Sequence, residues 1–155
     1  MSEPVRIVLD TNVLISALLF RNGRLRNLRL VWQAGHVQPV VSTATSAELL
    51  RVLNYKKFKL DSGDVQEALA LYIPYVATHS IDPHANAFLG HVPFCSDPKD
   101  HMFLDLAQTA NVEYLISGDE DLLRMDDPLC KHLTFRIISP RALLEKLFPN
   151  PALSQ

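Results

Sequence analysis

Short apolar runs alternate along the chain with longer segments in which apolar residues recur at helical spacing. The runs have the composition of strands buried on both faces of a parallel sheet, and they lie at 5–9, 37–41, 112–117 and 135–138. Expected helices lie at 13–20, 25–32, 44–53, 62–76, 98–110, 120–125 and 140–147. This alternation predicts a three-layer α/β/α sandwich around a mostly parallel sheet.

Residues 77–93 have a weaker pattern and are expected to form a loop with room for one short strand. No repeat or linker divides the chain of 155 residues, which suits one domain over 1–148 followed by a flexible tail at 149–155. Gly35 is expected to end the helix before it, because glycine favours the position just past a helix.

Composition excludes several classes of protein. Hydrophobic residues make up 48% of the chain, but none of its apolar runs approaches the roughly 20 residues that cross a bilayer. Cys95 and Cys130 form no metal-ligand pattern, and the N-terminus lacks the features of a secretion signal, so we expect a cytoplasmic protein with reduced thiols. A net charge of −2 argues against a uniformly basic nucleic-acid binder but not against a local basic surface.

Four carboxylates occupy positions that core packing does not explain. Asp10 and Asp119 directly follow expected strands, Glu48 lies on the helix after the second strand, and Asp100 opens the helix before the third. In open parallel sheets ligands bind beyond the carboxyl ends of the strands. Carboxylates crowded there repel one another unless a cation compensates, and hard oxygen ligands suit Mg²⁺ or Mn²⁺. The predicted chemistry is metal-assisted hydrolysis of a phosphodiester.

Each acidic residue also has a purely structural interpretation. Asp10 and Asp97 are favoured helix N-caps, and Asp100 suits the positive end of a helix dipole. Asp119 and Asp121 suit a turn. These interpretations are favoured for each residue taken singly, whereas the expected convergence of several carboxylates favours the metal site.

The order and spacing of these motifs resemble a PIN domain. The resemblance rests on Asp10-Thr11-Asn12 after a strand, Glu48 within 46–53, Asp97-Pro98-Lys99-Asp100, and 115–119 ending in Ser117-Gly118-Asp119. It covers residues 5–147 and is strongest to single-domain bacterial toxins of type II toxin–antitoxin pairs, relatives of the VapC ribonucleases. It implies a five-stranded parallel sheet of order 3-2-1-4-5, a Mg²⁺- or Mn²⁺-dependent endoribonuclease, an antitoxin partner and a homodimer or higher assembly.

The resemblance also implies roles for individual residues. The family's acidic quartet of catalytic metal ligands matches Asp10, Glu48, Asp100 and Asp119. Its supporting polar positions match Asn12 and Ser117, with Asp97 and Asp121 as nearby acids. Lys99 and His101 depart from the more acidic run of this subgroup, which bears on the number and affinity of bound ions.

A nuclease must also hold an anionic strand beside its acidic pocket. The residues expected to contact RNA are Arg21, Arg24, Arg26, Arg29, Lys56, Lys57, Lys59 and Lys99. Both basic groups follow elements that we expect to end near the acidic edge, and Tyr55 and Phe58 could stack on bases. A solvated helix face explains the same charges equally well.

Three rival functions remain. A haloacid dehalogenase-like phosphatase needs a second Asp where this chain has Asn12. A non-catalytic PIN-like module that binds RNA or protein has little reason to keep repelling carboxylates. A housekeeping RNA-processing nuclease shares the expected chemistry. The six histidines form no zinc motif, which argues against a histidine-based mechanism.

Overall fold

Five parallel strands form the centre of the molecule. The computed structural model describes residues 3–20, 22–81, 98–125 and 133–149. The strands are β1 (Val5–Leu9), β2 (Val37–Val41), β3 (Ala77–Thr78), β4 (Tyr114–Ile116) and β5 (Arg136–Ile138). Their order in the sheet is β3-β2-β1-β4-β5, and every pairing is parallel. The predicted sheet order is therefore confirmed.

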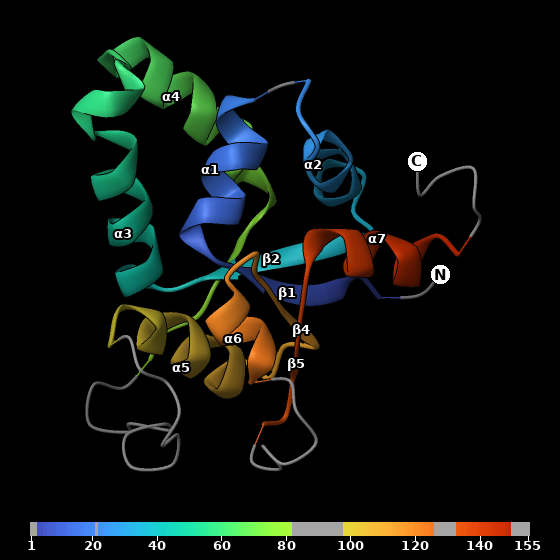
Figure 1. Cartoon of the computed structure of the whole chain (residues 1–155). Helices are drawn as coiled ribbons and strands as arrows, with labels where there is room; N and C mark the ends of the chain where they lie inside the picture. The colour runs from blue at the N-terminus through green and yellow to red at the C-terminus, as the bar shows by residue number, and fades with distance from the viewer. Residues whose placement is uncertain (1–2, 21, 82–97, 126–132, 150–155) are drawn as a thin grey trace.

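Helices cover both faces of this sheet, as Figure 1 shows. One face carries α1 (Thr11–Leu19), α2 (Arg26–Gln33), α3 (Thr43–Leu53), α4 (Ser62–Ala70) and α7 (Pro140–Leu147). The other face carries α5 (His101–Thr109) and α6 (Glu120–Arg124). Three 3₁₀ turns complete the described elements: η1 (Lys56–Phe58), η2 (Ile73–Tyr75) and η3 (Pro98–Asp100). The predicted three-layer sandwich is confirmed.

The strand residues alternate between two apolar cores, one on each face. Ile7 and Leu9 of β1 join the core beneath α1–α4 and α7, whereas Val8 joins the core beneath α5 and α6. In β4, Ile116 joins the first of these cores and Leu115 joins the second. Because both faces of the sheet are covered, the strands carry apolar residues on both faces rather than a strict alternation, with Arg6, Gln38 and Arg136 as polar exceptions.

Local sequence signals begin and end several helices, and Gly35 ends α2 as predicted. Gly35 adopts φ 82° just past α2, where its backbone N–H donates to the carbonyl of Trp32. Ser42 caps α3 by accepting from the backbone N–H of Thr45, and the Thr45 hydroxyl oxygen accepts in return from the backbone N–H of Ser42. These caps fix where each helix leaves the sheet.

The helix predicted over 62–76 is shorter in the structure. It ends as α4 at Ala70, and the chain continues into η2 and then β3. Pro74 within η2 has no backbone N–H to continue a helix. Tyr72 packs edge to face on Trp32 at 5.3 Å between ring centroids, and the Trp32 indole N–H donates to the carbonyl of Leu71 over 3.0 Å. Tertiary packing therefore replaces the last helical turns.

Some sequence-based expectations lie outside the described residues. These include the two cysteines, most of the segment at 77–93 and the tail beyond residue 149. None of the described helices is both long and apolar enough to cross a membrane.

Candidate functional site

The centre of the site is the point where β1 and β4 end side by side. Leu9 pairs with Ile116 in the sheet register, so Asp10 and Ser117 follow as neighbours. The backbone N–H of Asp10 donates to the carbonyl of Ile116 over 3.0 Å and anchors the loop. From β1 the sheet extends to β2 on one side and to β4 on the other, which makes this edge a topological switch point.

Ser117 joins two acidic residues through its hydroxyl group. Its side chain is fully buried; the hydroxyl donates to Asp10 Oδ2, and its oxygen accepts from the backbone N–H of Asp119 over 2.9 Å. The other Asp10 oxygen, Oδ1, accepts from the backbone N–H of Val13 over 2.9 Å. Both Asp10 oxygens are thus fixed, one by the start of α1 and one by the end of β4.

The environment of Asp10 disfavours its negative charge. The residue is only 6% exposed, and this burial is the main cause that raises the pKa of Asp10 above its ordinary value of 3.8. Hydrogen bonds from Ser117 and from the backbone of Val13 and Gly118 lower it in part, while the charge of nearby Asp119 raises it. A cation at this edge would relieve both the burial cost and the repulsion.

A cleft of about 640 Å³ opens in front of these carboxylates. Asp10, Asn12, Gly118 and Asp119 form its polar part. Asn12 and Asp119 line the cleft as residues exposed to solvent. Asp10 lines it as a buried residue. The cleft therefore combines a buried carboxylate with an open approach.

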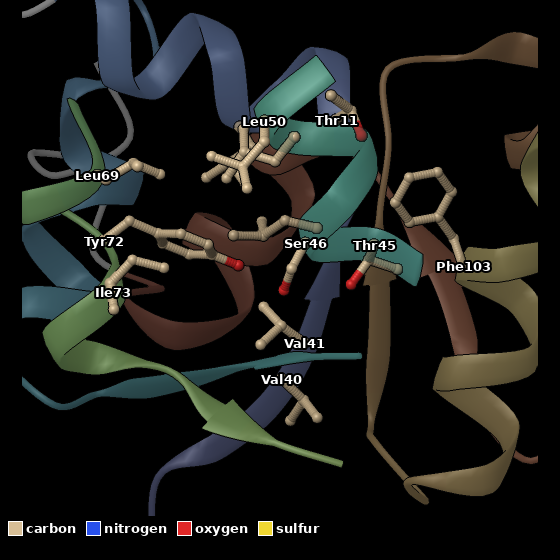
Figure 2. Close-up of a pocket in the computed structure, with 13 residues that line it drawn as sticks. Thr11, Val40, Val41, Thr45, Ser46, Leu50, Leu69, Tyr72, Ile73 and Phe103 are labelled. Carbon is tan, nitrogen blue, oxygen red and sulfur yellow. The ribbon is translucent and has the colours of Figure 1, made fainter. Parts of the chain in front are cut away.

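A second hollow, of about 130 Å³, lies between α1, α3, β2 and the segment from α4 to η2. Figure 2 shows the Tyr72 ring pointing into it with its hydroxyl toward Ser46, among Val40, Val41 and Leu50. Its lining is almost entirely apolar, so it lacks the ligands that a charged substrate or metal ion needs. The cleft at Asp10 is the candidate active site.

Glu48 is engaged by a neighbouring cation. Arg51, one helical turn on, donates from Nη2 to Oε1 over 2.6 Å and from Nε to Oε2 over 3.1 Å. Arg51 also donates to the Tyr55 hydroxyl and lies over the Tyr55 ring, 5.3 Å from its centroid. The Glu48 side chain is 19% exposed and lies on α3, which packs against α1.

The remaining predicted acids lie apart from the cleft lining or outside the described residues. Asp100 is half-buried at the junction of η3 and α5. Asp121 donates its backbone N–H to Asp119 Oδ1 over 2.9 Å, and its carboxylate forms an exposed ion pair with Arg124. Asp97 lies outside the described residues. Among the residues that the structure describes, no three His, Cys, Asp or Glu side chains converge as a metal site.

The structural interpretation of Asp10 and Asp119 as helix N-caps is confirmed, and their role as metal ligands stays a prediction that is compatible with it. Each residue caps a helix, Asp10 for α1 and Asp119 for α6, and the two lie close enough for their charges to interact. A buried carboxylate and an exposed one at an open cleft fit Mg²⁺ or Mn²⁺, which bind one or two carboxylates and keep several waters. The convergence of Glu48 and Asp100 with this pair stays a prediction.

The predicted RNA contacts fall in different parts of the molecule. Arg24 is exposed and lines the cleft, and Arg26 is exposed at the start of α2. Arg29 was expected to contact RNA, but it is buried with only 9% exposure and donates to the carbonyl of Ala17 over 2.9 Å. Its guanidinium instead joins α2 to α1. Arg21 lies outside the described residues, and Lys99 is exposed.

The lysine cluster lies farther from the acidic edge than the sequence suggested. Lys56, Lys57 and Lys59 are exposed in and after η1, and Lys57 Nζ lies 5.1 Å from the Phe58 ring centroid. α3 leads away from the sheet toward η1 (Figure 1). Its 11 residues correspond to about 16 Å of helix between the acidic edge and these lysines.

Sequence reasoning did not single out Phe20, which lines the cleft and is 58% exposed. The sequence pattern places it at the end of an apolar helix, most of whose other residues are buried. Its place immediately before a turn with Gly23 and Arg24 is the one sequence signal for a different role.

The fold and the cleft together define a parallel α/β protein with an acidic site at its topological switch point. Its sequence matches the PIN domain family over residues 6–121, and the chain belongs to that family, as its motifs predicted. PIN domains are generally nucleases, and they usually bind divalent metals. No curated protein matches this chain at a significant level.

Two solved structures share the fold. PAE2754 from Pyrobaculum aerophilum is 13% identical, with a TM-score of 0.61 over 94% of this chain and 91% of that chain. VapBC2 from Rickettsia felis, bound to a DNA fragment from its promoter, is 14% identical, with a TM-score of 0.53 over 87% of this chain and 98% of that chain.

Proposed function

We propose that this PIN domain is an endoribonuclease that hydrolyses RNA phosphodiester bonds with the help of Mg²⁺ or Mn²⁺. The observation that carries the proposal is the pair Asp10 and Asp119, joined by the buried Ser117 hydroxyl at the floor of an open cleft. Membership of a family composed mainly of nucleases supports it.

Asp10 and Asp119 would hold the ion, with Glu48 and Asp100 as further proposed ligands. When bound, a divalent ion supplies charge stabilisation for the phosphoryl transition state and lowers the pKa of the attacking water. Ser117 fixes the Asp10 carboxylate and the Asp119 backbone in one arrangement, and Asn12 offers an amide at the cleft surface. In the reaction, water adds to phosphorus, the bond to the leaving ribose oxygen breaks, and that oxygen takes up a proton.

We further propose that the protein is the toxin of a type II toxin–antitoxin pair that acts on cytoplasmic RNA. Its fold is shared with a VapBC complex, which supports an antitoxin protein as partner. A homodimer or higher assembly is part of the same proposal. A housekeeping role in RNA processing would use the same site with no antitoxin.

A non-catalytic RNA-binding module is the second candidate function. The bidentate pairing of Glu48 with Arg51 favours it, because that carboxylate already has a cation. In a nuclease, Arg51 must release Glu48 before this carboxylate can serve a metal ion.

The test is cleavage of a labelled single-stranded RNA by the purified protein with Mg²⁺, with Mn²⁺ and with EDTA. We expect cleavage only with the metals, none by Asp10→Asn, and a roughly 10- to 100-fold loss with Ser117→Ala, because it orients a ligand. Glu113→Gln is the control, because it replaces an exposed carboxylate just before β4 with an amide. It should keep full activity.

Two results would contradict the proposed activity. Cleavage that persists in EDTA or in Asp10→Asn would exclude the metal site. RNA binding that weakens with salt, without any cleavage, would favour the binding module.

A further inference from the structure

The cleft has a second part of its lining, formed by the end of α1 and the turn before α2. Phe20, Gly23 and Arg24 contribute to it, while Asp10 and Asp119 lie in the same cleft. The site therefore contains an aromatic ring and a guanidinium group in addition to its carboxylates. The proposed hydrolysis uses neither of them.

Phe20 is exposed although its own helix is otherwise a core element. Val13, Leu14, Ile15, Ala17 and Leu18 of α1 are all buried, whereas Phe20 is 58% exposed at the C-cap, with φ −108° and ψ 82°. A single exposed apolar residue is ordinary on a protein surface. This one, however, lines the cleft that holds the acidic pair, where an aromatic face is available to a ligand.

Backbone hydrogen bonds link Phe20 to the segment that carries Arg24. The backbone N–H of Gly23 donates to the carbonyl of Phe20 over 2.9 Å, and the N–H of Arg26 donates to the carbonyl of Gly23 over 3.2 Å. A Cβ atom at position 23 would lie 3.0 Å from the Phe20 Cβ. A side chain at position 23 would therefore crowd Phe20, which favours glycine in this turn.

Arg24 supplies the positive charge of the cleft. Its side chain is exposed and forms no ion pair within the described part of the chain. A guanidinium group in a cleft with two carboxylates is suited to a phosphate that also approaches a metal ion. An aromatic ring in the same cleft is suited to a base of the same strand, because unpaired bases stack on aromatic side chains.

We propose that Phe20 and Arg24 form a subsite for one unpaired nucleotide of the RNA, with its base on the Phe20 ring and a backbone phosphate on Arg24. The inference rests on the proposed ribonuclease function and assigns to Phe20 the contact with an unpaired base. A base inside a duplex is already stacked on its neighbours and leaves no face for Phe20.

The test is the affinity for a fluorescein-labelled single-stranded RNA, measured by fluorescence anisotropy in EDTA, and for the same RNA as a duplex. We expect Phe20→Leu, which keeps the apolar character but removes the ring, to bind the single strand about tenfold more weakly. Phe20→Trp should bind at least as tightly as the wild type. Arg24→Gln should weaken binding. It should also lower the slope of log affinity against log salt concentration by the amount that about one phosphate contact contributes.

Tyr75→Leu is the matched control, because Tyr75 is an exposed aromatic residue, at 37%, outside the cleft lining. Its affinity for the single strand should equal that of the wild type. Circular dichroism before each titration checks that the variants are folded. Because Phe20 and Arg24 are exposed, we expect their substitutions to leave the fold intact.

The outcomes separate this inference from the proposed function. If Phe20→Leu binds as tightly as the wild type, if the duplex binds as well as the single strand, or if the wild type binds no RNA, the subsite is wrong. Metal-dependent cleavage by the wild type with unchanged Phe20→Leu affinity overturns the subsite alone. Phe20-dependent binding without cleavage supports the subsite and overturns the hydrolase.

Discussion

A single hydroxyl group, that of Ser117, determines the arrangement of the acidic site. It has no exposed surface, donates to Asp10 and accepts from the backbone of Asp119, so it links the ends of two adjacent strands. Asp10 is held in turn by the first turn of α1. A buried carboxylate fixed from two sides keeps its oxygens in place before any cation arrives, which reduces the reorganisation that metal binding would require.

This arrangement carries a cost in stability, which Asp10→Asn should reveal. Because the pKa of Asp10 is raised in the folded protein, the folded state keeps its proton to higher pH than the unfolded state. The contribution of Asp10 to stability is therefore greatest below its ordinary pKa of 3.8 and is lost as pH rises through the higher folded-state value. In EDTA, the free energy of unfolding of Asp10→Asn minus that of the wild type should therefore increase as the pH rises from 4 to 7.

Urea unfolding followed by circular dichroism measures this difference. Adding Mn²⁺ at tenfold its dissociation constant should stabilise the wild type by about 1.4 kcal/mol and leave Asp10→Asn unchanged. A difference between the two proteins that is constant with pH would contradict the assigned direction of the pKa shift.

At the scale of elements, the walls of the cleft depend on how α2 is held in place. Its hydrophobic side packs through Trp32, which is 1% exposed, contacts Tyr72 and bonds the carbonyl of Leu71. Arg29, which is buried on the same side of the helix, donates to the carbonyl of Ala17 in α1. The turn that carries Phe20 and Arg24 lies between α1 and α2, so these contacts position it relative to Asp10.

Trp32→Phe should lower the free energy of unfolding by about 2 kcal/mol, because it leaves the Leu71 carbonyl without its indole donor and fills less of the core. Leu30→Ala, on the exposed side of the same helix, should change it by less than about 0.5 kcal/mol. Urea unfolding followed by circular dichroism suits both variants, since Trp32 is the only tryptophan. An equal loss in the two variants would show that the indole contacts contribute little.

At the scale of the whole molecule, the parallel sheet explains why residues distant in sequence share one site. β1 and β4 are neighbours because the chain first extends the sheet through β2 and β3 and then returns to the other side of β1. Asp10 and Ser117 meet although 107 positions separate them. No local signal encodes that contact, which follows from the order of the strands.

Apolar runs that end at carboxylates predicted a parallel sheet and the edge with Asp10 and Asp119, whereas the order of the strands was predicted from the resemblance to a PIN domain. It did not predict the end of α4, where Pro74 and the packing of Tyr72 on Trp32 override helical periodicity. It also assigned Arg29 to RNA, since nothing in the spacing showed that a carbonyl of α1 would bind it. Phe20 was missed because exposure is a property of the folded chain.

The most direct test of a metal-dependent site is the anomalous scattering of crystals soaked in Mn²⁺. A peak within about 2.0–2.4 Å of a carboxylate oxygen from both Asp10 and Asp119 is the predicted result. The same map shows whether Glu48 has left Arg51 and whether Asp100 joins the ion. Full Mn²⁺ occupancy elsewhere, with none between Asp10 and Asp119, would contradict the account.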